Sequence, residues 1–204
     1  MVLSSLSGLL AQITRPPGIL LFIALMSYIL FRFFFQRKET VTNYLRYIPL
    51  LSIPLGLLSI FILYSQTYGD FFAYFHSGDN IHLTFPPFQV FNKGQFWVGD
   101  IWLEDIIYIF ILGFLGVAML LRKKLYPLAF FVLTYLVAST LVVHRDISRY
   151  ILPVTPFILI AFERILVSRE FKLILPIILL AIYLYTQNFI IQNVAPYPNL
   201  QPFN

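Results

Sequence analysis

Six apolar stretches, each close to the length that crosses a lipid bilayer, constrain this chain more than any other feature. A helix that spans about 30 Å of hydrocarbon needs about 20 mostly apolar residues. The stretches cover about 18–35, 47–65, 104–121, 125–143, 148–166 and 172–190. Strands are not expected, because an open sheet leaves backbone groups unpaired in lipid. The chain is therefore predicted to be all-α, a polytopic bundle of transmembrane helices.

The composition agrees with lipid as the solvent. Of the 204 residues, 59% are hydrophobic and 11% are charged, and the mean hydropathy is +0.82. Such values lie outside the range of soluble globular domains. We predict a single membrane domain over 1–204, with a partial helix and turn over 1–17. A long outer loop over 66–103 is predicted to contain an interfacial helix.

The basic residues are distributed unevenly between the two ends of the predicted spans. If the spans alternate in direction, ten of the 14 basic residues fall on one side, within 32–46, 122–124 and 164–172. Because basic loops stay in the cytoplasm, both termini and the outer loop are predicted to lie outside. The net charge of +5 is then a signal of topology, and nucleic acid is not expected as a partner. We predict an integral protein of a bacterial plasma membrane whose functional face lies outside the cytoplasm.

The first segment, 1–13, is apolar but too short to span the bilayer. It has neither the basic start nor the small-residue cleavage pattern of a signal peptide. A chain that begins outside the cytoplasm without a preceding span is also difficult to insert. The hypothesis is that the chain is the C-terminal portion of a longer membrane protein.

Motifs for cofactors and metals are missing from the sequence. It has no cysteine, Walker loop, His-Glu-x-x-His helix or Gly-x-Ser-x-Gly elbow. No cofactor is evident and no metal site is predicted, although a divalent cation is left open. The central turns of the spans hold almost no charges, which disfavours the ion path of a transporter.

Polar side chains gather on the predicted outer side. All three histidines lie there, in or beside loops: His76, His82 and His144. For each one taken alone, a plain surface histidine is the simplest interpretation. Together they make the outer side the place to expect a binding site.

The string HRDISRY, His144 to Tyr150, places four ionisable groups between two predicted spans. If the next helix begins early, Arg145 and Arg149 stand one turn apart and could fork onto a phosphate. The alternative is that Asp146 pairs with an arginine in a solvated cap. Prolines follow at once, so the outer end of this helix should be irregular.

Two further candidates lie on the same side. Asp70, in the amphipathic segment Tyr68–Asn80, could bind a substrate hydroxyl or a metal, but capping the interfacial helix is the simpler role. Arg15 precedes Pro16, Pro17 and Gly18 in a rigid turn. It could bind a substrate, or it could reach lipid phosphate without any substrate.

Three segments together resemble the C-terminal membrane half of the GT-C glycosyltransferase superfamily. They are ITRPPGILL at 13–21, GDFFAYFH at 69–76 with PPFQVF at 86–91, and SRYILPVTPFILI at 148–160. The likeness is strongest to bacterial relatives of the glycosylphosphatidylinositol mannosyltransferase that adds the second mannose. In such proteins an Arg-Pro-x-Gly turn opens a late span, and a Ser-Arg-Tyr string begins another.

The resemblance implies a membrane mannosyltransferase-like protein that transfers sugar from a polyprenyl-phosphate donor to a lipid or protein acceptor outside the cytoplasm. The matching positions would bind lipid phosphate or substrate: Arg15, Asp70, His76, Arg145 and Arg149, with His144 beside them. The catalytic residue is unknown, because the acid of the family lies in a first outer loop that has no counterpart here. A non-enzymatic membrane subunit or scaffold with a partner-docking outer loop is the alternative, and a transporter fragment is third.

Overall fold

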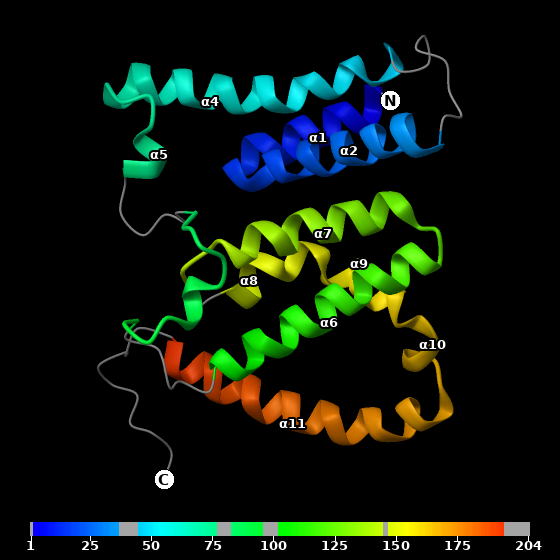
Figure 1. The fold of residues 1–204 in the computed structure, drawn as a ribbon. Helices are drawn as coiled ribbons and strands as arrows, with labels where there is room; N and C mark the ends of the chain where they lie inside the picture. The colour runs from blue at the N-terminus through cyan, green and yellow to red at the C-terminus, as the bar shows by residue number, and fades with distance from the viewer. Residues whose placement is uncertain (1, 37–44, 77–82, 96–101, 145–146, 194–204) are drawn as a thin grey trace. The chain divides into compact units, whose positions relative to one another are not determined.

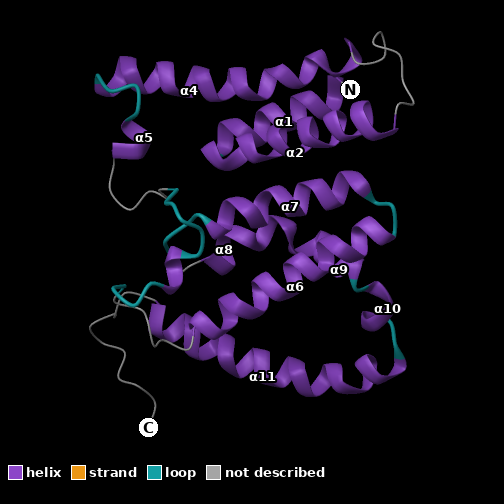
Figure 2. Ribbon diagram, in the orientation of Figure 1, coloured by secondary structure: helices purple, strands orange, loops and turns teal. Residues whose placement is uncertain are grey.

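The computed structural model describes residues 2–36, 45–76, 83–95, 102–144 and 147–193. Every regular element in these residues is a helix, apart from an isolated antiparallel bridge between Leu83 and Val142 (Figures 1 and 2). The prediction of an all-α chain is confirmed for this part. The chain divides into two compact units, Met1–Ala161 and Phe162–Asn204. Each unit is described by itself, and the single domain over 1–204 stays a prediction.

The first part of this unit consists of helices and short helical turns. They are α1 (Val2–Thr14), η1 (Pro16–Gly18), α2 (Ile19–Phe31) with its π-helical continuation η2 (Arg32–Gln36), η3 (Leu45–Leu51) and α4 (Ser52–Tyr68). A second group follows a partly irregular segment. Its members are α5 (Ala73–His76), η4 (Gln89–Phe91), α6 (Trp102–Arg122), α7 (Tyr126–Thr140), α8 (Ile147–Ile151), η5 (Leu152–Val154) and α9 (Thr155–Ala161).

Helix packing in the first unit follows a chain of neighbours. α1 lies against α4, α2 lies against α7, and α6 packs on both α7 and α9 (Figure 1). Gly56 lets α1 and α4 approach closely, since a Cβ there would lie 2.5 Å from Leu9 Cδ1. Small residues at helix crossings are typical of packing in lipid, where apolar surface alone drives little association. Ile29, Leu50 and Ile53 form a buried cluster where α2, η3 and α4 meet.

Three helical segments are long and apolar enough to cross a membrane: Pro16–Phe35, Leu45–Tyr68 and Arg169–Gln187. They correspond to three of the predicted spans and indicate a membrane protein. The other predicted spans, 104–121, 125–143 and 148–166, are helical but supply shorter apolar segments, of which Tyr126–Thr140 is one. Six full spans are therefore not confirmed. The predicted partial helix within 1–17 is present as α1, followed by the turn η1.

The region 148–166 is not one continuous helix. It divides into α8, η5 and α9 in the first unit, and α10 (Glu163–Leu166) in the second. Pro153 lies inside η5 and Pro156 follows the start of α9. Each proline lacks the N–H that would continue the helical hydrogen bonds, which explains the interruption. The irregularity that the prolines predict is therefore confirmed, while the side of the membrane on which it lies stays a prediction.

The second unit consists of α10 and α11 (Arg169–Asn193). The Ser168 hydroxyl accepts a hydrogen bond from the Phe171 N–H at 3.1 Å, which satisfies one of the free donors at the start of α11. Most apolar side chains of the Arg169–Gln187 segment are not covered by other parts of the protein. Lipid is the solvent that suits such a surface.

The predicted outer loop folds back onto the end of α7. The Thr84 N–H donates to the Leu141 carbonyl at 2.7 Å, and the Phe88 N–H donates to the Thr140 carbonyl at 2.6 Å. Val90 is fully buried beside this contact region. The backbone of 83–91 and the segment that leads to His144 therefore lie together, as expected if both occupy one side of the bundle.

Within the described residues, the predicted interfacial helix over 68–80 begins only at Ala73. α4 continues to Tyr68, Gly69 adopts a left-handed φ of 71°, and α5 contains only Ala73–His76. Gly69 is suited to end a helix, because it has no Cβ to clash in the left-handed conformation. The residues 77–82 lie outside the described part. The amphipathic segment is thus a helical turn within the described residues.

Candidate functional site

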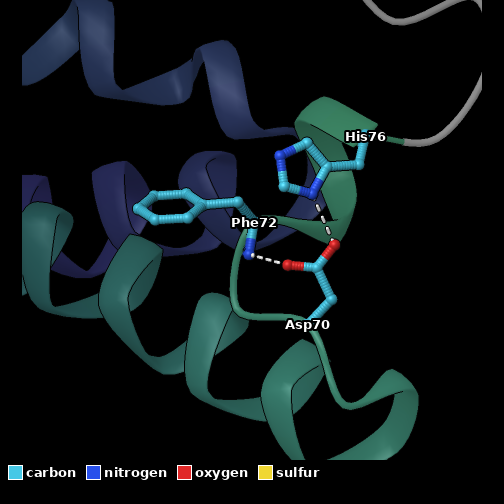
Figure 3. A network of polar contacts seen from close by, with 3 residues as sticks. All are labelled: Asp70, Phe72 and His76. Carbon is cyan, nitrogen blue, oxygen red and sulfur yellow. Dashed lines mark hydrogen bonds and ion pairs between the residues drawn. The ribbon is translucent and has the colours of Figure 1, made fainter.

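Asp70 and His76 are joined directly by the turn at the end of α4 (Figure 3). Asp70 Oδ1 accepts a hydrogen bond from the Phe72 N–H at 2.9 Å, and Oδ2 lies 2.6 Å from His76 Nδ1. One carboxylate therefore closes the turn and holds the last residue of α5. Asp70 thus forms a local turn of the Asx type before α5. The capping role that the sequence favoured stays a prediction, because the backbone bond comes from Phe72 and not from an N–H of the helix.

These contacts explain the electrostatics of Asp70. The hydrogen bond from His76 holds the pKa of this carboxyl below its ordinary value, and the Phe72 N–H acts in the same direction. Desolvation, the second-largest effect after the His76 hydrogen bond, opposes them. Both oxygens have a local partner, which favours a positional role for Asp70 over direct binding of a metal or a hydroxyl.

Phenylalanine rings attach the same turn to α4. The Phe61 ring lies 5.3 Å from that of Phe71, 6.1 Å from that of Phe72 and 5.9 Å from that of Phe75, measured between centroids. All three pairs are close to edge-on, an arrangement that aromatic quadrupoles favour. The 70–76 turn is therefore held on the end of α4, and Tyr74 is carried with it.

Tyr74 brings three of the predicted segments together. The charges of the Tyr150 and Tyr64 phenols and of the Arg15 guanidinium act on the pKa of its phenol. Burial is the largest cause and raises that pKa, the two phenols raise it further, and Arg15 lowers it. The phenol thus stays protonated and keeps its O–H as a donor near neutral pH. We call Arg15, Tyr64, Tyr74 and Tyr150 the arginine–tyrosine cluster.

Arg15 enters this cluster from the turn between α1 and η1. Its backbone is extended, with φ −153° and ψ 132°. Its N–H donates to the Ala11 carbonyl at 3.3 Å, and its carbonyl accepts from the Gly18 N–H at 2.9 Å. Pro16 and Pro17 occupy the first positions of η1, where a missing N–H costs nothing. The side chain of Arg15 is exposed, while its backbone is fixed on both sides.

The HRDISRY string is only partly described. The His144 ring lies 5.5 Å from the Tyr150 ring in an edge-on contact, and Arg149 is exposed on α8. Arg145 and Asp146 lie outside the described residues, as does His82. Neither the predicted clamp of Arg145 and Arg149 nor the alternative pairing with Asp146 is tested, and both stay predictions.

The opposite ends of the helices carry basic residues that have contacts within the protein. Arg32 donates to the Tyr47 hydroxyl at 3.3 Å, and its guanidinium lies 5.9 Å from the Tyr28 ring centroid. Lys123 Nζ donates to the Ile160 carbonyl at 2.9 Å, near the end of α9. A cation there satisfies a free carbonyl and complements the negative helix end.

Metal binding finds little support in the part of the chain that is described. No group of three or more histidine, cysteine, aspartate or glutamate side chains gathers there in a way that could hold an ion. The pair Asp70 and His76 alone offers too few ligands for a protein-bound divalent cation. Whether a substrate phosphate brings such a cation stays open.

Sequence reasoning did not single out Tyr64, Tyr74 or Tyr150. Tyr74 and Tyr150 stand inside the segments GDFFAYFH and SRYILPVTPFILI, and a search of those segments for hydroxyl donors could have found them. Tyr64 has no such signal, because it is one of several aromatic residues on α4. Gln12, a fully buried amide in an otherwise apolar part of α1, was also missed.

No protein-family model, no curated protein and no solved structure matches this chain. The likeness to GT-C glycosyltransferases therefore rests on the sequence motifs alone.

Proposed function

We propose that this chain is part of a membrane-embedded, mannosyltransferase-like glycosyltransferase that binds a polyprenyl-phosphate sugar at the arginine–tyrosine cluster. The observation that carries the proposal is the exposed Arg15, whose backbone is fixed directly before the membrane-length segment Pro16–Phe35. Its charge, like those of Tyr64 and Tyr150, acts on the Tyr74 phenol. Arg15, Tyr74 and Tyr150 come from the three segments that resemble the superfamily. Tyr64 comes from α4, which lies between the first two of these segments in the sequence. The functional face is proposed to lie outside the cytoplasm, and the acceptor is proposed to be a lipid or a protein.

The chemistry of the cluster suits a lipid phosphate. A guanidinium presents paired N–H donors that match phosphate oxygens, and it remains charged at any physiological pH. The Tyr74 phenol, whose pKa is raised, adds a neutral donor without adding charge. Arg15 stands next to η1, at the start of the membrane-length segment Pro16–Phe35. A phosphate there could keep its polyprenyl chain in the bilayer.

In sugar transfer this arrangement would bind and stabilise the leaving group. As the glycosidic bond breaks, negative charge grows on the phosphate oxygen that departs from the sugar. A guanidinium already aimed at that oxygen stabilises the charge without reorganisation. Arg15 would thus be a binding group, and the general base that activates the acceptor is not assigned.

Equilibrium binding tests the proposal. The full chain in detergent micelles is titrated with a short-chain polyprenyl phosphate and, separately, with the matching uncharged polyprenol. Arg15→Ala should weaken phosphate binding by about 1.5–3 kcal/mol, the usual contribution of a charged hydrogen bond, or roughly ten- to a hundredfold in Kd. Arg122→Ala is the matched control, because Arg122 is an exposed cation at the end of α6.

The outcome separates the proposed function from the scaffold alternative. Selective phosphate binding that Arg15→Ala weakens and Arg122→Ala leaves unchanged supports the glycosyltransferase proposal. Equal affinity for phosphate and polyprenol, or no change in Arg15→Ala, contradicts it. The non-enzymatic membrane subunit would then be the better account.

A further inference from the structure

Gln12 is a buried amide that spans the Arg15 turn. Its side chain is fully buried, and Nε2 donates to the Pro16 carbonyl at 3.1 Å. The bond therefore connects the last turn of α1 to the first residue of η1, with Arg15 in between. Oε1 of the same amide is buried and has no hydrogen-bond partner among the described residues.

Packing alone does not account for an amide at this position. The Pro16 carbonyl also accepts a hydrogen bond from the Ile19 N–H, so it would remain satisfied without Gln12. The buried Oε1, in contrast, is an unpaired acceptor, which is unfavourable. An apolar side chain of similar length would fill the same space and leave no polar atom unpaired. The stability of α1 alone therefore does not explain an amide at this position.

The remaining contacts show what the amide holds. A Cβ on Gly18 would lie 2.7 Å from the Gln12 Cα and 3.0 Å from the Ala11 carbonyl oxygen, so the turn is pressed directly onto α1. The Ala11 carbonyl accepts from the Arg15 N–H at 3.3 Å and from the Thr14 hydroxyl at 2.7 Å. The Gln12 bond completes this set on the far side of Arg15. It fixes the peptide that follows Arg15, and hence the backbone position from which the side chain of Arg15 extends.

We infer that Gln12 is a positioning residue for Arg15: its amide holds the Arg-Pro-Pro-Gly turn, and so fixes the backbone from which the guanidinium extends to bind phosphate. This inference rests on the proposed function. Gln12 does not touch the ligand, and its effect passes through the Pro16 carbonyl. A preorganised guanidinium loses less freedom on binding than one that must be ordered by the ligand.

Gln12→Met separates positioning from stability. Methionine matches the length of glutamine, removes the unpaired Oε1 and cannot donate to Pro16. The thermal unfolding temperature of the full chain in detergent should be equal to or above that of the wild type. The Kd for a short-chain polyprenyl phosphate should rise by up to about tenfold, the order expected for a side chain that must be ordered on binding. Ser7→Ala is the control, because the Ser7 hydroxyl is exposed on the same helix.

Gln12→Glu supplies a pH readout that a purely structural role would not give. Burial raises the pKa of a carboxyl, so the protonated acid would donate to the Pro16 carbonyl as the amide does. At low pH, Gln12→Glu should bind polyprenyl phosphate with the affinity of the wild type. Its affinity should fall below that of the wild type as the pH rises and the acid ionises. This second variant decides the question if Gln12→Met does not fold.

The results separate this inference from the proposed function. If Arg15→Ala weakens phosphate binding but Gln12→Met binds like the wild type, the inference fails and the proposed function stands. If Gln12→Met loses stability together with affinity, and Gln12→Glu follows the wild type at every pH, Gln12 is structural and the inference also fails. If Arg15→Ala has no effect, the proposed function fails, and the role of Gln12 fails with it.

Discussion

At the scale of single residues, Asp70 and Arg15 show how similar sequence signals lead to different roles. Both were candidates for binding, and both stand beside a turn at the end of a helix. Asp70 uses both carboxylate oxygens on Phe72 and His76, so its charge serves its own segment. Arg15 is fixed through its backbone, and its side chain is exposed, with a charge that acts on the Tyr74 phenol. We therefore propose Arg15, and not Asp70, as the binding group.

The Asp70 turn should weaken in acid. A carboxyl whose pKa is lowered in the folded state stabilises that state above its ordinary pKa of 3.8, and the contribution is lost as the pH falls through the folded value. Amide hydrogen exchange of Phe72 to His76, corrected for intrinsic rates, should show protection falling in that acid range. Asp70→Asn cannot titrate and should show weaker, pH-independent protection. The same acid loss in Asp70→Asn would contradict this role.

At the scale of elements, the sequence predicted where helices lie better than where they break. Apolar runs fixed the positions of α2, α4, α6, α7 and α11, because lipid requires each backbone to satisfy its own hydrogen bonds. The interruption after α8 was also foreseeable from Pro153 and Pro156. The late start of α5 was not foreseeable in this way. The amphipathic pattern predicts a helix from Tyr68 onward, but Gly69 and the Asp70 turn separate α4 from α5.

The start of α11 depends on one hydroxyl. Ser168→Ala should destabilise the first turn of α11 by about 1 kcal/mol, because the Phe171 N–H loses its acceptor. Ser168→Asp should keep the turn, since a carboxylate at this position accepts the same bond and complements the positive helix end. Hydrogen exchange at the Phe171 amide in detergent measures both variants. Wild-type protection in Ser168→Ala would show that this cap contributes nothing.

At the scale of the whole molecule, the sequence predicted which segments share a side but not which side chains meet. Alternating spans placed the Arg15 turn, the 66–103 loop and the HRDISRY string on one side, and the contact of Thr84 with Leu141 joins the loop to the segment just before that string. The influence of Arg15 and Tyr150 on Tyr74 depends on packing between segments far apart in the chain. No local pattern encodes such packing, which is why the tyrosines and Gln12 were missed.

Photochemical cross-linking tests the central claim, that a lipid phosphate binds at the arginine–tyrosine cluster from outside the cytoplasm. A membrane-impermeant short-chain prenyl phosphate that carries a diazirine is added to right-side-out vesicles containing the full chain, and the labelled peptides are identified by mass spectrometry. The account predicts labels near Arg15 and within 64–76 that excess polyprenyl phosphate removes and polyprenol does not. Labels confined to the basic end around 122–124, or equal competition by both lipids, would contradict it.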